Sequence, residues 1–220
     1  NIGCGNATFP NAEWLLATAD TMIARGFAEA GYTSMNLDEG WADNLRADNN
    51  TGEQVANGTR FPDGMAPVAA ALRSRGLELG IYTARAALTC GGFSAGSCEH
   101  EALDAEKYVE WNVSYLKDDG CGGCYGTEPD DALVSYATMQ SALTKAARAA
   151  NVAPMFFSTE ASPNVTAMSE RPDLYGNTWR SGHDAIPSWG SVLSQYDLAS
   201  GFHPLAHTDK GHGGWFVDCD

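Results

Sequence analysis

The chain has 220 residues, of which 44% are hydrophobic and 19% charged, and this composition suits one globular domain with a buried core. It excludes a disordered tail, a coiled coil and a miniature disulfide scaffold. The 28 acidic residues outnumber the 13 basic ones, so the net charge of −15 argues against a nucleic acid or an anionic membrane as partner.

Apolar residues recur at helical spacing in several segments, with short strand-like runs between them. Met65, Val68, Ala69 and Leu72, for example, follow the i, i+3, i+4, i+7 pattern of a helix, and Pro67 falls in its first turn, where proline is tolerated. In chain order the sequence predicts a helix at 11–28, a strand at 31–37, a helix at 63–75, a strand at 77–82, a helix at 100–111, a strand at 113–117, a helix at 130–150, strands at 153–158 and 178–180, a helix at 188–199 and a strand at 214–217.

This alternation of strands and helices predicts β/α units around a parallel sheet, in one domain over residues 1–220. Polar residues follow the successive strands, as expected where the loops of a (β/α)8 TIM barrel converge on one face. An open sheet would more often carry a phosphate loop, and neither of the usual glycine motifs occurs. The length falls short of a typical barrel, so we expect the barrel to lack the start of its first strand and everything after its seventh.

No apolar run is long enough to cross a membrane, and no signal peptide precedes Asn1, so the sequence reads as a mature chain or a fragment. Six cysteines allow 15 pairings, which the sequence alone leaves open. Together with the glycosylation pattern Asn-x-Ser/Thr, they favour the secretory pathway, secreted or lysosomal/vacuolar, over a cytosolic protein with free thiols. The pattern stands at Asn6, Asn49, Asn57, Asn112 and Asn164.

Cys121 and Cys124 form a C-x-x-C pair, which can belong to a redox centre or to half of a zinc site. The pair lies in a glycine-rich loop rather than at the start of a helix, and no second C-x-x-C follows it. Two disulfides that join this loop to the loop of Cys90 and Cys98 are the simpler interpretation. Redox and metal chemistry remain the alternatives.

Two acidic residues are candidates for acid and nucleophile chemistry on a sugar. Asp119 ends a predicted strand, and Lys117 lies two residues earlier on the same face, where its charge would favour an ionised carboxylate. Asp184 follows Arg180, a pairing that is more often structural than catalytic.

Several segments in order resemble glycoside hydrolase family 27, which includes α-galactosidases and α-N-acetylgalactosaminidases. The resemblance covers nearly the whole chain and is far more specific than any single motif. Its segments are Asn-Leu-Asp-Glu-Gly-Trp at 36–41, Arg-Phe-Pro-Asp-Gly at 60–64, Gly-Leu-Glu-Leu-Gly-Ile-Tyr at 76–82, Tyr-Leu-Lys-Asp-Asp-Gly-Cys at 115–121, Trp-Arg-Ser-Gly-His-Asp at 179–184 with Trp189 after it, Gly-Gly-Trp at 213–215 and Asp-Cys-Asp at 218–220.

The resemblance implies a retaining exo-glycosidase that needs neither a metal nor another cofactor and acts on a carbohydrate substrate. Asp119 would be the nucleophile and Asp184 the acid/base. The substrate-binding residues would be Asp38, Glu39, Tyr82, Lys117, Glu160, Arg180 and Asp220. It also implies a disulfide between Cys90 and Cys121, which leaves Cys124 as the sensible partner for Cys98. Cys4 and Cys219 are left over.

Departures from the family pattern define the alternatives. Glu39 replaces an aspartate that grips the sugar and would crowd the space for C6, as in the β-L-arabinopyranosidases of the family. Asp118 replaces an aromatic residue, and its charge could raise the apparent pKa of Asp119, although adjacent strand residues point to opposite faces. Ala161 replaces a tryptophan. The sequence thus predicts an α-galactosidase first, a β-L-arabinopyranosidase second, and a catalytically degenerate carbohydrate-binding or structural glycoprotein as the alternative from another class. It makes no prediction of the oligomeric state.

Overall fold

A computed structural model describes residues 9–126, 130–160, 168, 171–180, 182, 184–206 and 216–218. Its main sheet has six parallel strands, in the order β1-β4-β5-β6-β7-β8. These strands are β1 (Ser34–Asn36), β4 (Glu78–Ala84), β5 (Tyr115–Asp119), β6 (Phe156–Thr159), β7 (Thr178–Arg180) and β8 (Phe216–Asp218). Each overlaps one of the six predicted strands, and their order in the sheet follows the chain, as in a barrel that winds in one direction.

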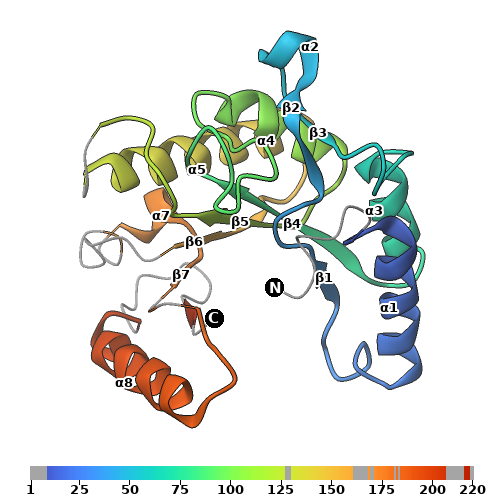
Figure 1. The fold of residues 1–220 in the computed structure, drawn as a ribbon. Coiled ribbons are helices and arrows are strands. Elements are labelled where there is room, and N and C mark those ends of the chain that lie inside the picture. The colour runs from blue at the N-terminus through green and yellow to red at the C-terminus, as the bar shows by residue number, and fades with distance from the viewer. Residues whose placement is uncertain are drawn as a thin grey trace.

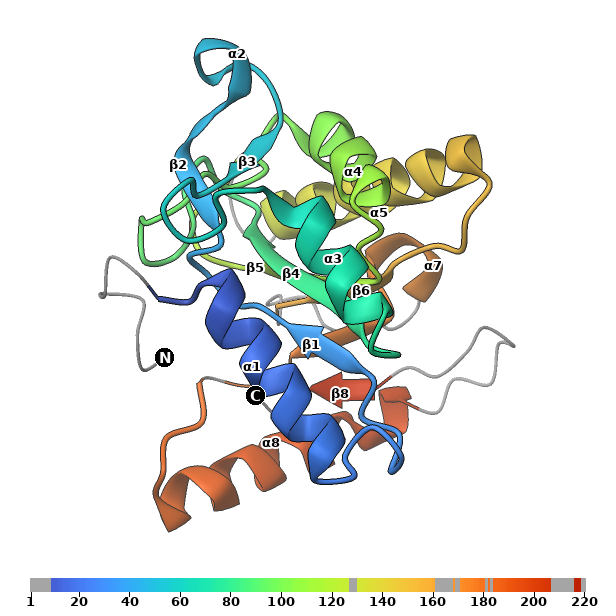
Figure 2. The same ribbon diagram turned by 90° about the vertical axis from the view of Figure 1, so that its right-hand side faces the viewer.

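The helices pack on the outer side of the curved row of strands (Figure 1). They are α1 (Ala12–Ala24), α3 (Met65–Arg73), α4 (Glu101–Glu110), α5 (Asp130–Ala150), α7 (Pro172–Tyr175) and α8 (Trp189–Ala206). Figure 2 shows α1 and α3 side by side in front of β1 and β4. Helix α1 ends before the predicted residue 28, because the chain turns at Gly26, whose φ of +78° lies in the left-handed region.

One element pair was not predicted from the sequence. Strands β2 (Ala42–Arg46) and β3 (Gln54–Ala56) form an antiparallel hairpin, joined by the short turn α2 (Ala47–Asn50). Polar residues fill most of β2, so no strand pattern is visible there. The buried side chain of Arg46 stabilises the hairpin: it forms an ion pair with buried Asp104 and donates to the carbonyl oxygen of Gly52 at 2.7 Å.

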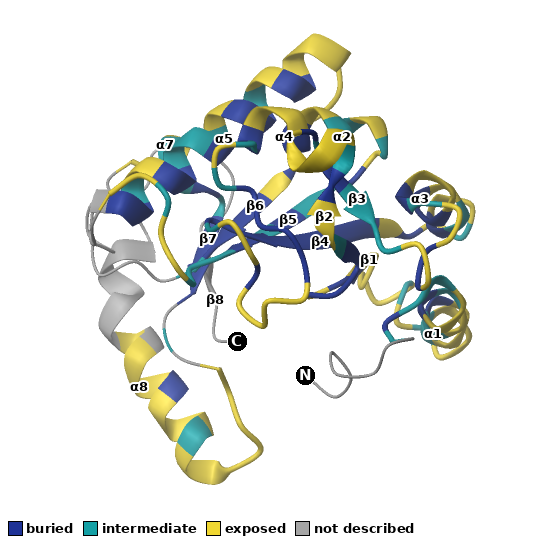
Figure 3. Cartoon of the chain, turned by 45° about the horizontal axis from the view of Figure 1, so that its top comes forward, coloured by how far each residue is buried: buried dark blue, intermediate teal, exposed yellow. Residues whose placement is uncertain are grey.

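The hydrophobic core lies between the sheet and its helices (Figure 3). Leu79 and Ile81 of β4 and Leu116 of β5 are buried there, against Leu72 of α3 and Met139 of α5. In β5 the burial alternates, so Leu116 and Asp118 face the helices while Lys117 and Asp119 face the inner side of the sheet. This register brings the predicted catalytic strand into position. No helix among the described residues is long and apolar enough to cross a membrane.

Candidate active site

The predicted site residues gather at the carboxyl ends of neighbouring strands. Tyr82 of β4 is paired in register with Lys117 of β5, and Ala84 is paired with Asp119. Glu160 follows β6 directly, and Arg180 ends β7. Because parallel strands place their carboxyl ends at one edge of the sheet, these four segments, which are far apart in sequence, meet here.

A cavity of about 660 Å³ opens at this edge, and a second hollow of about 480 Å³ adjoins it. Asp119, Asp184 and Cys90 line both, so the two predicted catalytic acids border the same space. The cavity is lined by Asp38, Glu39, Tyr82, Cys90, Gly91, Phe93, Lys117, Asp119, Asp184, Ala185 and Ile186. The adjoining hollow adds Gly120, Cys121, Glu160 and Arg180.

Asp119 is held as a carboxylate by its neighbours. The Tyr82 hydroxyl donates to Oδ2 at 2.7 Å, and the Gly120 amide donates to Oδ1 at 2.8 Å. Burial acts to raise the pKa of Asp119, but hydrogen bonds from Glu160 and Tyr82 and the nearby charge of Lys117 outweigh it and lower the pKa. An ionised, oriented carboxylate is what a nucleophile requires.

Glu160 lies beside Asp119 and has the higher pKa of the two acids. Burial, together with its hydrogen bond to Asp119 and the charge of that residue, raises the pKa of Glu160 to about 7. The Gly120 amide lies between the two acids and also donates to Glu160 Oε2 at 3.2 Å. A Cβ on Gly120 would stand 2.8 Å from Glu160 Cγ, so only glycine permits this approach.

Arg180 connects Glu160 to the second predicted catalytic acid. Its Nη1 donates to Glu160 Oε1 at 2.9 Å, and its Nη2 forms an ion pair with Asp184. The Arg180 side chain is buried, whereas 72% of the Asp184 side chain is exposed. Asp184 therefore stands at the open side of the site, where a leaving group can reach solvent.

Lys117 and Asp38 form the opposite wall. Lys117 Nζ lies 3.1 Å from Asp38 Oδ2 and 5.4 Å from the centre of the Tyr82 ring. The predicted proximity of Lys117 to Asp119 is confirmed, since the charge of Lys117 contributes to the lowered pKa of that carboxyl.

Glu39 lines the cavity, but its carboxylate is engaged by the loop after β4. It accepts hydrogen bonds from the Thr89 hydroxyl and from the amide of Gly91, the latter at 2.8 Å. The sequence predicted a side chain that projects into the space for the sugar. It gave no sign of these contacts, because the loop lies 50 residues further along the chain.

The charge of Asp118 is not among the main influences on the pKa of Asp119, which is lowered overall. Asp118 faces the helices instead, and only 1% of its surface is exposed. Burial and the charges of Glu101 and Asp119 raise its own pKa well above the usual range. Neighbouring residues on a strand point to opposite faces, so the two carboxyls lie in different surroundings.

Both expected disulfides are present: Cys90 is bonded to Cys121, and Cys98 to Cys124. The first joins the loop after β4 to the loop that follows Asp119. Among the described residues, one group of potential metal ligands lies close together, Cys90, Cys121 and Asp119, but both of its sulfur atoms belong to this disulfide. Cys121 and Cys124 are each bonded to another cysteine, so neither offers the free thiol that a redox pair or a zinc site would use.

The remaining sequence predictions fall in different places. Asn49, in the turn of the hairpin, and Asn112, after α4, are exposed, and Asn57 is half-buried. Glycosylation at all of these positions stays a prediction. Asn6, Asn164, Cys4, Cys219 and Asp220 lie outside the described residues.

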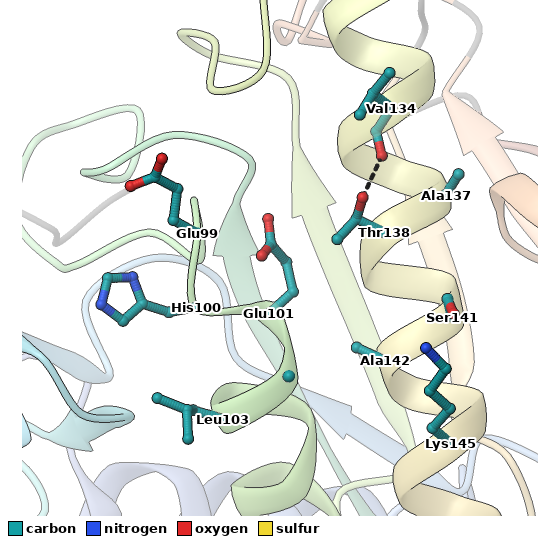
Figure 4. A pocket seen from close by; sticks show the side chains of 11 residues that line it. Glu99, His100, Glu101, Leu103, Val134, Ala137, Thr138, Ser141, Ala142 and Lys145 are labelled. Carbon is teal, nitrogen blue, oxygen red and sulfur yellow. Dashed lines mark hydrogen bonds between the residues drawn. The ribbon is translucent and has the colours of Figure 1, made fainter.

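Another hollow, of about 620 Å³, lies between α4 and α5 rather than at the strand ends (Figure 4). Its two carboxylates, Glu99 and Glu101, come from the same short stretch of chain. The Tyr125 hydroxyl lies 2.9 Å from both carboxylate oxygens of Glu101. Among the described lining residues, α5 contributes Lys145 but no acid opposite Glu99 and Glu101, so this hollow differs from the strand-end cavity.

Comparison with known proteins agrees with this geometry. The family model described as alpha galactosidase A matches residues 6–220. An α-galactosidase of Coffea arabica is 35% identical over 81% of this chain and 44% of its own length. A protein of Dictyostelium discoideum named "Probable alpha-galactosidase" is 37% identical over 84% of this chain and 44% of its own. The chain thus spans less than half the length of these relatives.

Solved structures show the same fold. An α-galactosidase from Saccharomyces cerevisiae superimposes with a TM-score of 0.78 at 25% identity and covers 99% of this chain and 50% of its own. A β-L-arabinopyranosidase from Geobacillus stearothermophilus gives 0.73 at 15% identity over 96% of this chain and 57% of its own, a likeness of fold alone. The curved parallel sheet is therefore an incomplete (β/α)8 barrel, and the chain belongs to glycoside hydrolase family 27, the α-galactosidase family.

Proposed function

We propose that this chain carries the catalytic site of a retaining exo-α-galactosidase, which removes a terminal α-linked galactose from an oligosaccharide or glycoconjugate. The observation that carries the proposal is that Asp119 and Asp184 line one cavity at the strand ends. The names of its relatives, α-galactosidases at 31–37% identity, support the glycone.

The two acids suit a double displacement. Asp119 attacks the anomeric carbon and forms a covalent glycosyl-enzyme ester, while Asp184 gives its proton to the leaving oxygen. Asp184 then takes a proton from water, which attacks the same carbon and releases Asp119 as a carboxylate. In a retaining enzyme the two carboxyl groups stand about 5–5.5 Å apart, and we expect that separation here.

The remaining site residues would hold the sugar. Lys117 and Asp38 offer a cation and a carboxylate to its hydroxyl groups, and Glu160 and Arg180 flank the nucleophile on the other side. Asp220 belongs to this proposal as well, and Glu39 borders the same space. A β-L-arabinopyranosidase is the second candidate, favoured only by the longer side chain of Glu39.

The two disulfides and the exposed sequons at Asn49 and Asn112 support maturation in the secretory pathway. The proposal therefore includes a secreted or lysosomal/vacuolar location. Oxidising conditions are also those in which the Cys90–Cys121 bridge beside the nucleophile persists.

Hydrolysis of an aryl α-galactoside and of an aryl β-L-arabinopyranoside tests the proposal. We expect the galactoside to be preferred and the first product to be the α-anomer by proton NMR. Asp119→Asn should retain less than about a thousandth of the wild-type rate, because it removes the carboxylate that attacks the anomeric carbon. Asp173→Asn is the matched control, since Asp173 is an exposed acid paired with Arg171 away from the cavity.

Three results would contradict the proposal. A larger residual rate in Asp119→Asn would indicate another nucleophile. A β-anomeric first product would indicate inversion. Sugar binding without turnover of any pyranoside would support the degenerate, non-catalytic alternative.

A further inference from the structure

The carboxylate of Glu39 faces protein and not only the cavity. Besides the Thr89 hydroxyl and the Gly91 amide, it accepts a hydrogen bond from the Phe93 amide at 3.3 Å. Only 7% of the Glu39 surface is exposed. Three donors from one five-residue segment converge on this carboxylate, so Glu39 fixes the position of that segment, the 89–93 loop.

The same loop forms a wall of the cavity. Cys90, Gly91 and Phe93 all line it, and 48% of the Phe93 surface remains exposed. A Cβ on Gly91 would stand 2.8 Å from Glu39 Oε2 and 2.6 Å from Phe93 Cε2. Glycine at this position is thus required for Glu39 and the Phe93 ring to approach the same backbone.

Phe93 belongs to the apolar part of the cavity. The other apolar lining residues, Ala185 and Ile186, are exposed and follow Asp184 directly. A sugar that reacts with Asp119 must bring its anomeric carbon to the strand ends, so the leaving group points toward the exposed rim. The flat face of an aromatic ring packs well on the C–H face of a sugar or on another ring.

We propose that Glu39 is a positioning residue for the 89–93 loop, and that it thereby sets the Phe93 ring as a wall that binds the aglycone. This inference rests on the proposed function and deepens it. The long side chain of Glu39 allows its carboxylate to reach the loop. Glu39 then affects substrate choice indirectly, because the loop positions the Phe93 ring. The ligand class at this wall is a ring-containing leaving group, either aryl or pyranosyl.

Four variants separate a positioning role from a direct contact with the reacting sugar. Thr89→Val removes a donor to Glu39 from a buried residue that does not line the cavity. Glu39→Asp keeps the charge but shortens the reach, and Glu39→Gln keeps the length. Phe93→Ala removes the wall. Leu88→Ala is the matched control, because Leu88 is an exposed residue of the same loop region outside the cavity lining.

Two substrates with one glycone provide the readout. For 4-nitrophenyl α-galactoside, whose aglycone is a ring, Thr89→Val, Glu39→Asp and Phe93→Ala should each raise KM about three- to tenfold, the worth of one aromatic contact. For α-galactosyl fluoride, which has no aglycone ring to contact Phe93, KM should stay within about twofold of wild type. Glu39→Gln should be milder than Glu39→Asp.

Hydrogen exchange of the Gly91 and Phe93 amides in the substrate-free chain gives a test without turnover. Thr89→Val and Glu39→Asp should speed this exchange, whereas Leu88→Ala should not. Unchanged exchange rates in Thr89→Val and Glu39→Asp overturn the positioning role. The role is also overturned if Thr89→Val leaves KM unchanged while Glu39→Asp raises KM equally for both substrates. A silent Phe93→Ala overturns the aglycone wall. If wild type turns over neither substrate, the proposed function fails, and the exchange rates alone then decide whether Glu39 positions the loop.

Discussion

At the scale of single residues, the carboxyl groups of Asp119 and Glu160 lie close together and have pKa values shifted in opposite directions. Asp119 has a lowered pKa, while the pKa of Glu160 is raised to about 7. The pair thus holds one proton below that pH and none above it. In the ionised pair, two negative charges face one another across the Gly120 amide.

The shared proton predicts a pH dependence of catalysis. As the pH rises through about 7, Glu160 loses its proton, the two carboxylates repel each other, and kcat/KM should fall. Glu160→Gln keeps a hydrogen-bond donor at every pH. Its kcat/KM should therefore be lower than that of wild type but should begin to fall only at a pH above that of the wild-type fall. Profiles of kcat/KM against pH for both proteins provide the measurement. An unchanged falling limb in Glu160→Gln would place the titrating proton on another group.

The same shift affects stability in a direction that can be checked without substrate. A folded-state pKa above the usual value near 4.5 means that folding favours the protonated form of Glu160. Its contribution to the free energy of unfolding is therefore complete below about pH 4.5 and is lost as the pH rises to about 7. Thermal unfolding of Glu160→Gln should lack this loss.

The sequence predicted which residues line the site better than it predicted the hydrogen bonds between them. Lys117 and Asp119 could be placed on one face of β5, because strand alternation is a local rule. The bond of Glu39 to the 89–93 loop could not be predicted. It depends on how two loops fold against each other, and no local pattern records that.

At the scale of elements, the strands and long helices follow from periodicity, whereas the β2–β3 hairpin does not. Its strands are short and polar, and their stability comes from contacts with distant parts of the chain. Arg46 forms an ion pair with Asp104 of α4, and the backbone amide of Gln54 donates to the same carboxylate at 2.8 Å. A buried ion pair between residues 58 positions apart therefore anchors the hairpin to α4.

This anchor predicts an unequal response to single and double substitution. Asp104→Ala leaves the Arg46 guanidinium buried without its partner, and should lower the free energy of unfolding by about 3–5 kcal/mol. Arg46→Met together with Asp104→Leu removes both charges and should restore much of that loss. Denaturant unfolding with the disulfides intact measures both. A double variant less stable than Asp104→Ala would mean that the polar contacts, rather than the unpaired charge, dominate.

At the scale of the whole molecule, the described sheet is open. Strands β1 and β8 stand at its two ends, and each pairs on one side only. Unpaired strand edges promote association with other chains, whereas a net charge of −15 opposes it.

These opposing effects predict that the 220-residue chain associates as its charge is removed. Sedimentation should show little association at pH 7 in low salt, and growing association as the pH falls toward the isoelectric point near 4.5. Added salt at pH 7 should act in the same direction, because it screens the repulsion. A chain that remains monomeric under all these conditions would show that its edges are protected.

The bridge between Cys90 and Cys121 has a consequence for how the protein matures. No cysteine belongs to a described strand, so the sheet can pair while all thiols are still reduced. The loops that bear Cys90 and follow the nucleophile become joined only when these sulfurs oxidise. If the proposed function holds, newly synthesised protein would complete the pocket beside Asp119 only once it reaches oxidising conditions.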